Sequence, residues 1–206
     1  ENVIEALDVK SIYEVPIKYH ESNLDNQLLN HFKLLPTKKA NLNVWKAIVK
    51  TQGNSEGKVT IGVVGKYTSI IDSYKSLIEA LNHGGLANKT IVDIKWIDAE
   101  ELDGKIYQNS LVKDVSGILV SEGFGKRGSA GKINAIKYAR ESKIPFFSIC
   151  LGMQMAVIEF ARNVMNYSEA SSTEFEKTSL PLVSLLTEWV SKDGLIKRDL
   201  KSDFGG

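Results

Sequence analysis

Cys150 is the only cysteine of this chain, and the residues around it suit a nucleophile. The apolar run "IPFFSIC" ends at Cys150 and the helix-like stretch "LGMQMAVIEFARNVM" follows, so the pattern predicts a strand–turn–helix corner. Ser148 and Gly152, two residues away on either side, are small, as the tight turn of a nucleophile elbow requires. The N-terminus of the following helix would favour a thiolate and, later, an acyl oxyanion. A free cysteine beside an apolar run is also typical of a buried core, and the pattern leaves both interpretations open.

The glycine-rich segment "SEGFGKRGSAGK", which begins at Ser121, is the second candidate for chemistry. It could cradle a phosphate, present backbone N–H donors to an oxyanion at Cys150, or form a plain turn. It is not a P-loop, because no Gly-Lys-Ser/Thr closes it, and the acidic residue of the dinucleotide-binding fingerprint is not evident. Ligands of open parallel sheets bind outside the carboxyl ends of the strands, where the pattern places both this segment and Cys150.

The elements that must position these residues alternate between strand and helix patterns from Val59 onward. Continuous apolar runs predict buried strands at 59–65, 90–97, 115–120 and 144–150. Helix patterns lie between or after them, at 73–83, 131–141 and 151–165. This alternation predicts an α/β fold with a parallel sheet covered on both sides, in a Rossmann- or flavodoxin-like arrangement.

Two details of these helices are also predictions. Gly84 and Gly85 are expected to end the first helix. The last helix is expected to bury one apolar face, made of Val157, Ile158, Ala161, Val164 and Met165. After Asn166 the pattern weakens, and only residues 181–190 resemble a further strand.

The first 57 residues have a different character. The stretch "SIYEVPIKY" is predicted to be extended around Pro16, with short helices at 24–32 and 43–50. The polar, turn-rich stretch at 51–58 indicates a linker. Such a segment has too few apolar residues for a core of its own, so we interpret it as the tail of another domain or as a strap across the main one.

Composition excludes several classes of function. The formal net charge of +1 gives no basic excess for nucleic acid or an anionic membrane, and no apolar stretch approaches the roughly 18 residues of a membrane helix. The three histidines lack metal-ligand spacing, so we expect no metal site. One cysteine cannot form an internal disulfide, which indicates a reducing, cytoplasmic setting. We therefore expect small molecules or other proteins as partners.

The longest motif-bearing stretch, "GFGKRGSAGKINAIKYARESKIPFFSICLGMQMAVIEFARNV" followed by "SSTEF", resembles the glutamine amidotransferase domain of the CTP synthase family. Upstream, "IGVVGKY" fits the same family, as do "LTEW" and "KSDFGG" downstream, while "LDVKSIYEVP" resembles the end of the family's synthetase domain. The resemblance covers nearly the whole chain. It implies the tail of a synthetase domain and a linker at 1–57. It also implies, at 58–206, a glutamine amidotransferase domain of the class I type that is incomplete at the C-terminus.

This resemblance implies a chemistry. The family hydrolyses glutamine and uses the ammonia to convert ATP-activated UTP to CTP. Cys150 would attack the side-chain amide to form a γ-glutamyl thioester, and the N–H of Leu151, with one from the 122–123 turn, would hold the oxyanion. By the same resemblance, the residues that hold glutamine would be Gly123, Leu151, Gly152, Met153, Gln154 and Glu174, the last through the substrate's ammonium group.

Further roles implied by the resemblance concern nucleotides and assembly. Arg127 matches the family residue tied to activation by GTP and to ammonia channelling, although an arginine in a glycine loop is equally often only solvated. Leu7, Asp8 and Val9 match a stretch that contacts a nucleotide near its adenine. The family uses ATP, Mg and GTP, holds its UTP and ATP site in the synthetase domain, and forms homotetramers. From the present residues alone we expect no bound cofactor.

The chain departs from the family in three places. Glu122 replaces the first glycine of the family's P-G-G-F-G, where a positive φ would cost a non-glycine residue on the order of 1 kcal/mol. Ser148 replaces a glycine of the elbow, which we expect to be tolerated. The histidine and glutamate of the family's late H-P-E are absent from these 206 residues, and neither His20, His31 nor His83 lies in such a motif.

Two hypotheses follow from these departures. The preferred one is that the chain is the amidotransferase part of a CTP synthase, a fragment or a remnant, whose 206 residues alone do not catalyse the reaction. The other is a non-catalytic module that binds a partner or assembles with a full-length synthase. A different cysteine hydrolase of flavodoxin-like fold is disfavoured, because such enzymes carry their acid or base within the domain. An incomplete sheet domain is also expected to expose apolar surface and to aggregate.

Overall fold

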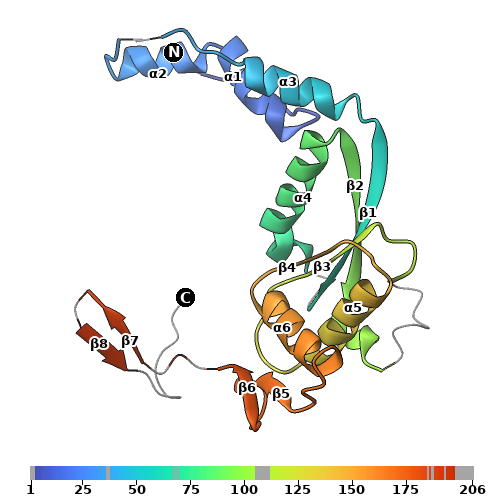
Figure 1. Cartoon of the computed structure of the whole chain (residues 1–206). Helices are drawn as coiled ribbons and strands as arrows, with labels where there is room; N and C mark the ends of the chain where they lie inside the picture. The colour runs from blue at the N-terminus through green and yellow to red at the C-terminus, as the bar shows by residue number, and fades with distance from the viewer. Residues whose placement is uncertain are drawn as a thin grey trace. The chain divides into compact units, whose positions relative to one another are not determined.

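The structure is a computed structural model that describes residues 3–35, 38–66, 68, 70–104, 112–184, 186, 188–192 and 194–197 (Figure 1). The chain divides into two compact units. The first consists of Glu1–Val59 with Ser76–Val92, and the second of Thr60–Lys75 with Asp93–Gly206. Among the described residues, no helix has both the length and the apolar character needed to cross a membrane.

A four-stranded sheet contains all four predicted strands. Its strands are β1 (Gly57–Gly65), β2 (Thr90–Asp98), β3 (Gly117–Val120) and β4 (Phe146–Ser148), in the order β2-β1-β3-β4. The pairing of β1 with β3 and of β3 with β4 is parallel, and Val120 lies opposite Ser148 at the carboxyl ends. The α/β prediction is therefore confirmed, and the segments that follow β3 and β4 begin side by side.

Helices α5 (Ser129–Glu141) and α6 (Leu151–Asn163) pack against each other and against β3 and β4 (Figure 1). The short helix η3 (Ala99–Leu102) packs on α5 so closely that a Cβ at Gly131 would lie 1.7 Å from the Ala99 oxygen. Together these elements form one core, whose buried members are Val64, Ile97, Ala99, Leu102, Val112, Ile118, Val120, Ala135, Ile136, Ala139, Leu151, Met155 and Ile158.

The predicted apolar face of α6 is wrong in part. Ile158 is buried, as is Ala161, but Val157, Val164 and Met165 are 42–51% exposed. The error arises because the helix is apolar on two sides, and the second stripe, which consists of Met153, Val157, Phe160 and Val164, is exposed.

The strand β4 is likewise not the buried strand that its apolar run predicts. It lies at an edge of the sheet, and Phe147 is 63% exposed. The exposed apolar surface predicted from the sequence is therefore present on β4 and on the outer stripe of α6, whereas aggregation stays a prediction.

After α6 the chain forms two small sheets in place of one further strand. β5 (Ala170–Ser172) pairs in parallel with β6 (Leu180–Val183), and β7 (Glu188–Ser191) pairs antiparallel with β8 (Gly194–Lys197). The strand expected at 181–190 is thus divided between β6 and β7. The motif "KSDFGG" at 201–206 lies outside the described residues.

The first unit contains η1 (Ile12–Glu14), α1 (Val15–Glu21), α2 (Leu24–His31), α3 (Asn43–Gln52) and most of α4 (Lys75–Ala87), which follows η2 (Ile71–Tyr74). The helices expected near 24–32 and 43–50 are confirmed as α2 and α3. The extended conformation expected around Pro16 is wrong, because this proline occupies the first turn of α1, where its missing N–H is not needed. The domain boundary at 57/58 stays a prediction.

Helix α4 does not end at its two glycines, as the sequence suggests, but continues to Ala87. The reason lies in what surrounds each glycine. A Cβ at Gly84 would meet nothing within 4 Å, whereas a Cβ at Gly85 would lie 2.5 Å from the Thr90 oxygen and 2.8 Å from a Val92 methyl. Gly85 therefore permits the close approach of α4 to the start of β2.

These neighbouring glycines give a matched pair of substitutions with opposite signs. Gly84→Ala should raise the free energy of unfolding by about 0.5–1 kcal/mol, because alanine restricts the unfolded chain and fits the helix. Gly85→Ala should lower it by about 1–3 kcal/mol, because the added methyl collides with backbone. Urea unfolding of both variants checks this, and equal effects of the two would contradict the packing described.

Candidate active site

Cys150 lies at the sharp corner between β4 and α6, as the N-cap residue of that helix. Its backbone has φ +53° and ψ −114°, a region that non-glycine residues occupy at a cost of about 1–3 kcal/mol. The thiol is exposed, so the interpretation of Cys150 as a core residue is wrong. Strain at an exposed nucleophilic side chain is the feature that a nucleophile elbow predicts.

Backbone hydrogen bonds and one close contact hold this corner against the end of β3. The Ile149 N–H donates to the Val120 oxygen at 3.0 Å, and the Gly152 N–H donates to the Ile149 oxygen at 2.8 Å. A Cβ at Gly152 would lie 2.2 Å from the Val120 oxygen, so only glycine fits there. The small residue two positions after Cys150 is thus explained by the approach of α6 to β3.

The loop after β3 takes its turns at glycines. Gly123, Gly125 and Gly128 have φ values of +151°, +73° and +69°. Glu122 is not among the described residues with positive φ, so the strain predicted for it is absent. The substitution at this position therefore leaves the backbone path of the loop unstrained.

The loop and the elbow meet at the carboxyl ends of β3 and β4. A Cβ at Gly123 would lie 3.7 Å from a Leu151 methyl, so the two segments are in contact. Within the described part of the chain, neither the Gly123 N–H nor the Leu151 N–H has a hydrogen-bond partner. These two amides are the donors that the resemblance assigns to an oxyanion.

Two buried lysines that the sequence analysis missed bind the backbone carbonyls of the loop. Lys132 of α5 is fully buried, and its ammonium donates to the Ser121 oxygen at 2.6 Å and to the Glu122 oxygen at 2.9 Å. Lys66, which follows β1 and is 6% exposed, donates to the oxygens of Phe124 (2.6 Å) and Gly125 (3.1 Å). Four carbonyls of one short loop are therefore bonded to two cations.

A signal for Lys132 was present in the sequence. Lys132 occupies the same helical stripe as Ala135, Ile136 and Ala139, so a charge stands where periodicity predicts a buried apolar residue. Lys66 directly follows a buried strand, at the edge where ligands of parallel sheets bind.

Burial has a strong effect on Lys132. Desolvation, with a smaller contribution from the nearby Lys66 charge, lowers the pKa of Lys132 to about 8, although Glu122 and Cys150 act in the opposite direction. Burial also lowers the pKa of Lys66, and Arg127 adds to that effect. The loop is thus held by two lysines whose charged form is disfavoured by burial, and such shifted pKa values are typical of functional sites.

Acidic residues after β5 connect a second segment to the loop. A carboxylate oxygen of the exposed Glu174 accepts a hydrogen bond from the Gly125 N–H at 2.5 Å. Glu176 accepts a hydrogen bond from the Ser171 hydroxyl at 2.8 Å and forms an ion pair with Lys126 at 3.1 Å. Both interactions lower the pKa of Glu176, and the bond to Ser171 has the larger effect. The predicted glutamine ligand Glu174 therefore lies at the loop.

The remaining predicted residues fall in different places. Met153 and Gln154 lie in the first turn of α6, the former exposed and the latter half-buried. Arg127 forms an exposed ion pair with Glu100 at 3.0 Å. The stretch 7–9 lies in an irregular segment of the first unit, apart in the chain from every other predicted site residue.

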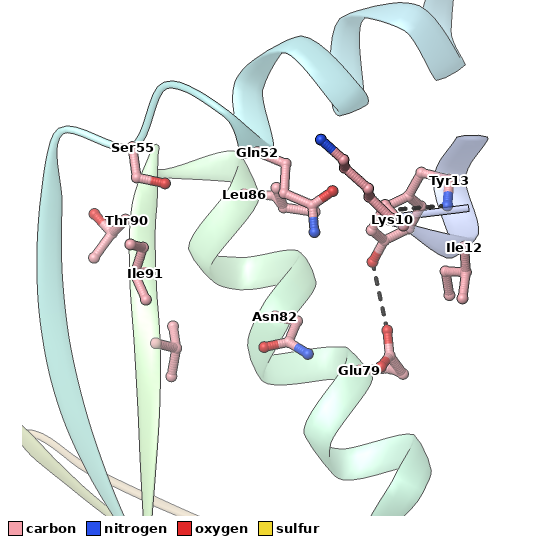
Figure 2. A pocket seen from close by; sticks show the side chains of 12 residues that line it. Lys10, Ile12, Tyr13, Gln52, Ser55, Glu79, Asn82, Leu86, Thr90 and Ile91 are labelled. Atoms are coloured by element: carbon pink, nitrogen blue, oxygen red, sulfur yellow. Dashed lines mark hydrogen bonds between the residues drawn. The ribbon is translucent and has the colours of Figure 1, made fainter. Parts of the chain in front are cut away.

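Two cavities are relevant to ligands. One of about 550 Å³ adjoins the loop and is lined by the cations Lys66, Lys126 and Arg127, among others. The other, of about 330 Å³, lies in the first unit; Lys10, Gln52 and Asn82 are among the residues that line it, and the Tyr13 hydroxyl donates to Glu79 of α4 at 3.4 Å (Figure 2). In the described part of the chain, no three His, Cys, Asp or Glu side chains are grouped to hold a metal ion.

Comparison with known proteins identifies the family. The model of the family "Glutamine amidotransferase class-I" matches residues 69–190, which is more than half of the chain. The chain belongs to the class-I glutamine amidotransferases. The match includes the loop, the elbow and the acidic segment after β5, whereas Lys66, which bonds to the loop, lies just before it.

Within this family, the chain is similar to CTP synthases. The CTP synthase of Sinorhizobium medicae (strain WSM419) is 52% identical over 204 residues, and that of Acidiphilium cryptum (strain JF-5) is 51% identical over 208. These matches cover 99–100% of this chain but only 38% of each relative. A solved structure, "Trypanosoma brucei CTPS - glutaminase domain with bound acivicin", is 37% identical with a TM-score of 0.59, over 67% of this chain and 54% of that one. The resemblance to CTP synthase is thus confirmed.

The buried ammonium of Lys132 makes stability depend on pH in a defined direction. Its pKa is about 8 in the folded chain against 10.5 for an ordinary lysine, so between these values the unfolded chain binds more protons and stability rises with pH. The free energy of unfolding of the wild type, relative to that of Lys132→Met, should therefore rise by on the order of 3 kcal/mol between pH 7 and pH 10.5.

Urea unfolding of both proteins across this range measures the difference. Lys137→Met, on the same helix but without a bond to the loop, is the control and should show no such trend. A difference between wild type and Lys132→Met that is independent of pH would contradict the buried, charged state of Lys132.

Proposed function

We propose that this chain carries the glutamine-hydrolysing site of a CTP synthase, with Cys150 as the nucleophile. The single observation that carries the proposal is the exposed thiol held at φ +53° beside the amides of Gly123 and Leu151, which have no hydrogen-bond partner among the described residues. The similarity to CTP synthases over almost the whole chain supports the choice of glutamine as substrate.

The proposed reaction proceeds in two steps. The Cys150 sulfur attacks the carbonyl carbon of the glutamine side-chain amide, and the oxygen takes a negative charge that the N–H groups of Gly123 and Leu151 stabilise. The C–N bond then breaks, the leaving nitrogen takes up the proton that the thiol gave up and departs as ammonia, and a γ-glutamyl thioester remains on Cys150. Water attacks this thioester, releases glutamate and restores the thiol.

The proton transfers of these steps need a general base, and the family uses a histidine–glutamate pair. None of His20, His31 and His83 lies in an H-P-E motif like that of the family. We therefore expect these 206 residues to present the nucleophile and the substrate site without completing turnover at an enzyme's rate.

Substrate recognition would come from the segments around the elbow. Glu174 would bind the ammonium of glutamine, since one of its oxygens is bonded to the Gly125 N–H and a carboxylate can accept several hydrogen bonds. Gly152, Met153 and Gln154 would line the substrate at the first turn of α6.

Nucleotide roles are more distant proposals. The cavity beside the loop is lined by three cationic side chains, Lys66, Lys126 and Arg127, and by one carboxylate, Glu122, so its net positive lining suits the phosphates of GTP. Leu7, Asp8 and Val9 would contact a nucleotide, and they directly precede Lys10, which lines the cavity of Figure 2. Amination of UTP with ATP and Mg, homotetramer formation and a cytoplasmic location would belong to the whole protein.

A second candidate function is a non-catalytic binding module. The exposed apolar stripe of α6, made of Met153, Val157, Phe160 and Val164, favours it because exposed apolar patches mark contacts with other protein segments. The unstrained Glu122 removes one reason to regard the loop as defective.

Acivicin, the compound bound in the Trypanosoma brucei relative, separates the two functions. We expect intact-mass spectrometry of the chain after incubation with acivicin to show one covalent adduct, to show none on Cys150→Ala, and to show slower labelling when glutamine is added. Hydrolysis of glutamine by the chain should stay near the background of Cys150→Ala.

Labelling that persists in Cys150→Ala would disprove the assignment of the nucleophile. Absence of both an adduct and glutamine binding would favour the binding module. Turnover at the rate of a complete amidotransferase would show that a base is already present among these residues.

A further inference from the structure

Lys132 is a charged residue that the proposed reaction does not use, yet it is fully buried at the site. Its ammonium bonds to two consecutive carbonyls, at Ser121 (2.6 Å) and Glu122 (2.9 Å), directly after β3 ends. Among the described residues, the Lys132 ammonium bonds only to these backbone oxygens and forms no ion pair. Burial of a lysine without an ion pair costs free energy, so we looked for the reason in the two oxygens that it holds.

The planarity of the peptide bond supplies this explanation. The Glu122 carbonyl and the Gly123 N–H belong to one peptide group, and no cis peptide bond is present among the described residues. In a trans peptide the C=O and N–H point in opposite directions. Because Lys132 draws the Glu122 oxygen toward α5, the Gly123 N–H must point away from α5.

We propose that Lys132 is a positioning residue that sets the direction of the Gly123 N–H and so forms one half of the oxyanion site at Cys150. This inference deepens the proposed function and rests on it for its catalytic meaning. Gly123 accommodates the resulting path because its φ of +151° is open to glycine. A Cβ there would lie 3.5 Å from the Lys132 nitrogen and 3.7 Å from a Leu151 methyl, so the amide is adjacent to both.

The two lysines divide the loop between them. Lys66 bonds to the carbonyls of Phe124 and Gly125, which lie after Gly123, and therefore does not set the peptide between residues 122 and 123. The titratable groups that act on the pKa of Lys132 are Lys66, Glu122 and Cys150.

The test compares Lys132→Met, which keeps the length of the side chain but cannot donate, with Lys137→Met on the same helix. Two readouts do not require glutamine. Hydrogen exchange, resolved by NMR, reports on the Ser121 and Gly125 amides, which are bonded to the Val64 oxygen and to Glu174. Alkylation by iodoacetamide reports on Cys150 alone, because it is the only cysteine.

In Lys132→Met we expect both amides to exchange about tenfold faster, since charge-assisted bonds to the loop are lost, and the rate of Cys150 alkylation at pH 7.5 to change several-fold, since the loop beside the thiol loses its anchor. Lys137→Met should match the wild type in both. If Lys132→Met folds and neither rate changes, Lys132 has no role in the site and the inference is overturned.

A second measurement on the wild type applies even if Lys132→Met does not fold. As the pH rises from 7 to 9.5, it passes the Lys132 pKa of about 8, so the ammonium becomes a neutral amine and its hydrogen bonds to the loop are no longer charge-assisted. After correction for intrinsic exchange, protection of Ser121 and Gly125 should fall relative to amides within β1. Constant protection would overturn the inference, whereas a failure of acivicin to label Cys150 would count against the proposed function alone.

Discussion

The parallel alignment of β3 with β4 is the constraint on which the site depends. Because Val120 lies opposite Ser148, the loop that follows one strand and the elbow that follows the other leave the sheet at the same level. The Val120 oxygen then accepts the Ile149 N–H and leaves no room for a side chain at Gly152. A register shift of one residue would separate Cys150 from Gly123, so the chemistry is set by strand pairing before any side chain contributes.

The loop shows how a site can be held by groups that lower stability. The burial of Lys132 opposes its charge, while its two bonds to carbonyls keep the charged form in place near neutral pH. An apolar residue at this position would avoid the cost of desolvation but would leave the Ser121 and Glu122 oxygens without a donor. Stability has been exchanged here for a fixed direction of the backbone, as is common in sites that bind a developing charge.

Much of this arrangement could be predicted from sequence, because apolar runs and helical periodicity report on burial. They indicate the four strands, the helices α5 and α6, and the corner at Cys150. Periodicity failed at α6, since a helix that is apolar on two sides does not reveal which side is buried. It also failed at Pro16 and Gly85, whose roles depend on position within a helix turn and on a neighbouring strand. Lys132 was missed because nothing local tells a buried lysine from a solvated one unless its place on the apolar stripe is considered.

A crystal structure of Cys150→Ala with glutamine bound would test the central claim most directly. The account predicts that the side-chain oxygen of glutamine lies about 2.7–3.1 Å from both the Gly123 and the Leu151 nitrogens, with the substrate ammonium at Glu174. Glutamine bound elsewhere, or with its side-chain amide directed away from the loop, would contradict the assignment of this corner as the site of hydrolysis.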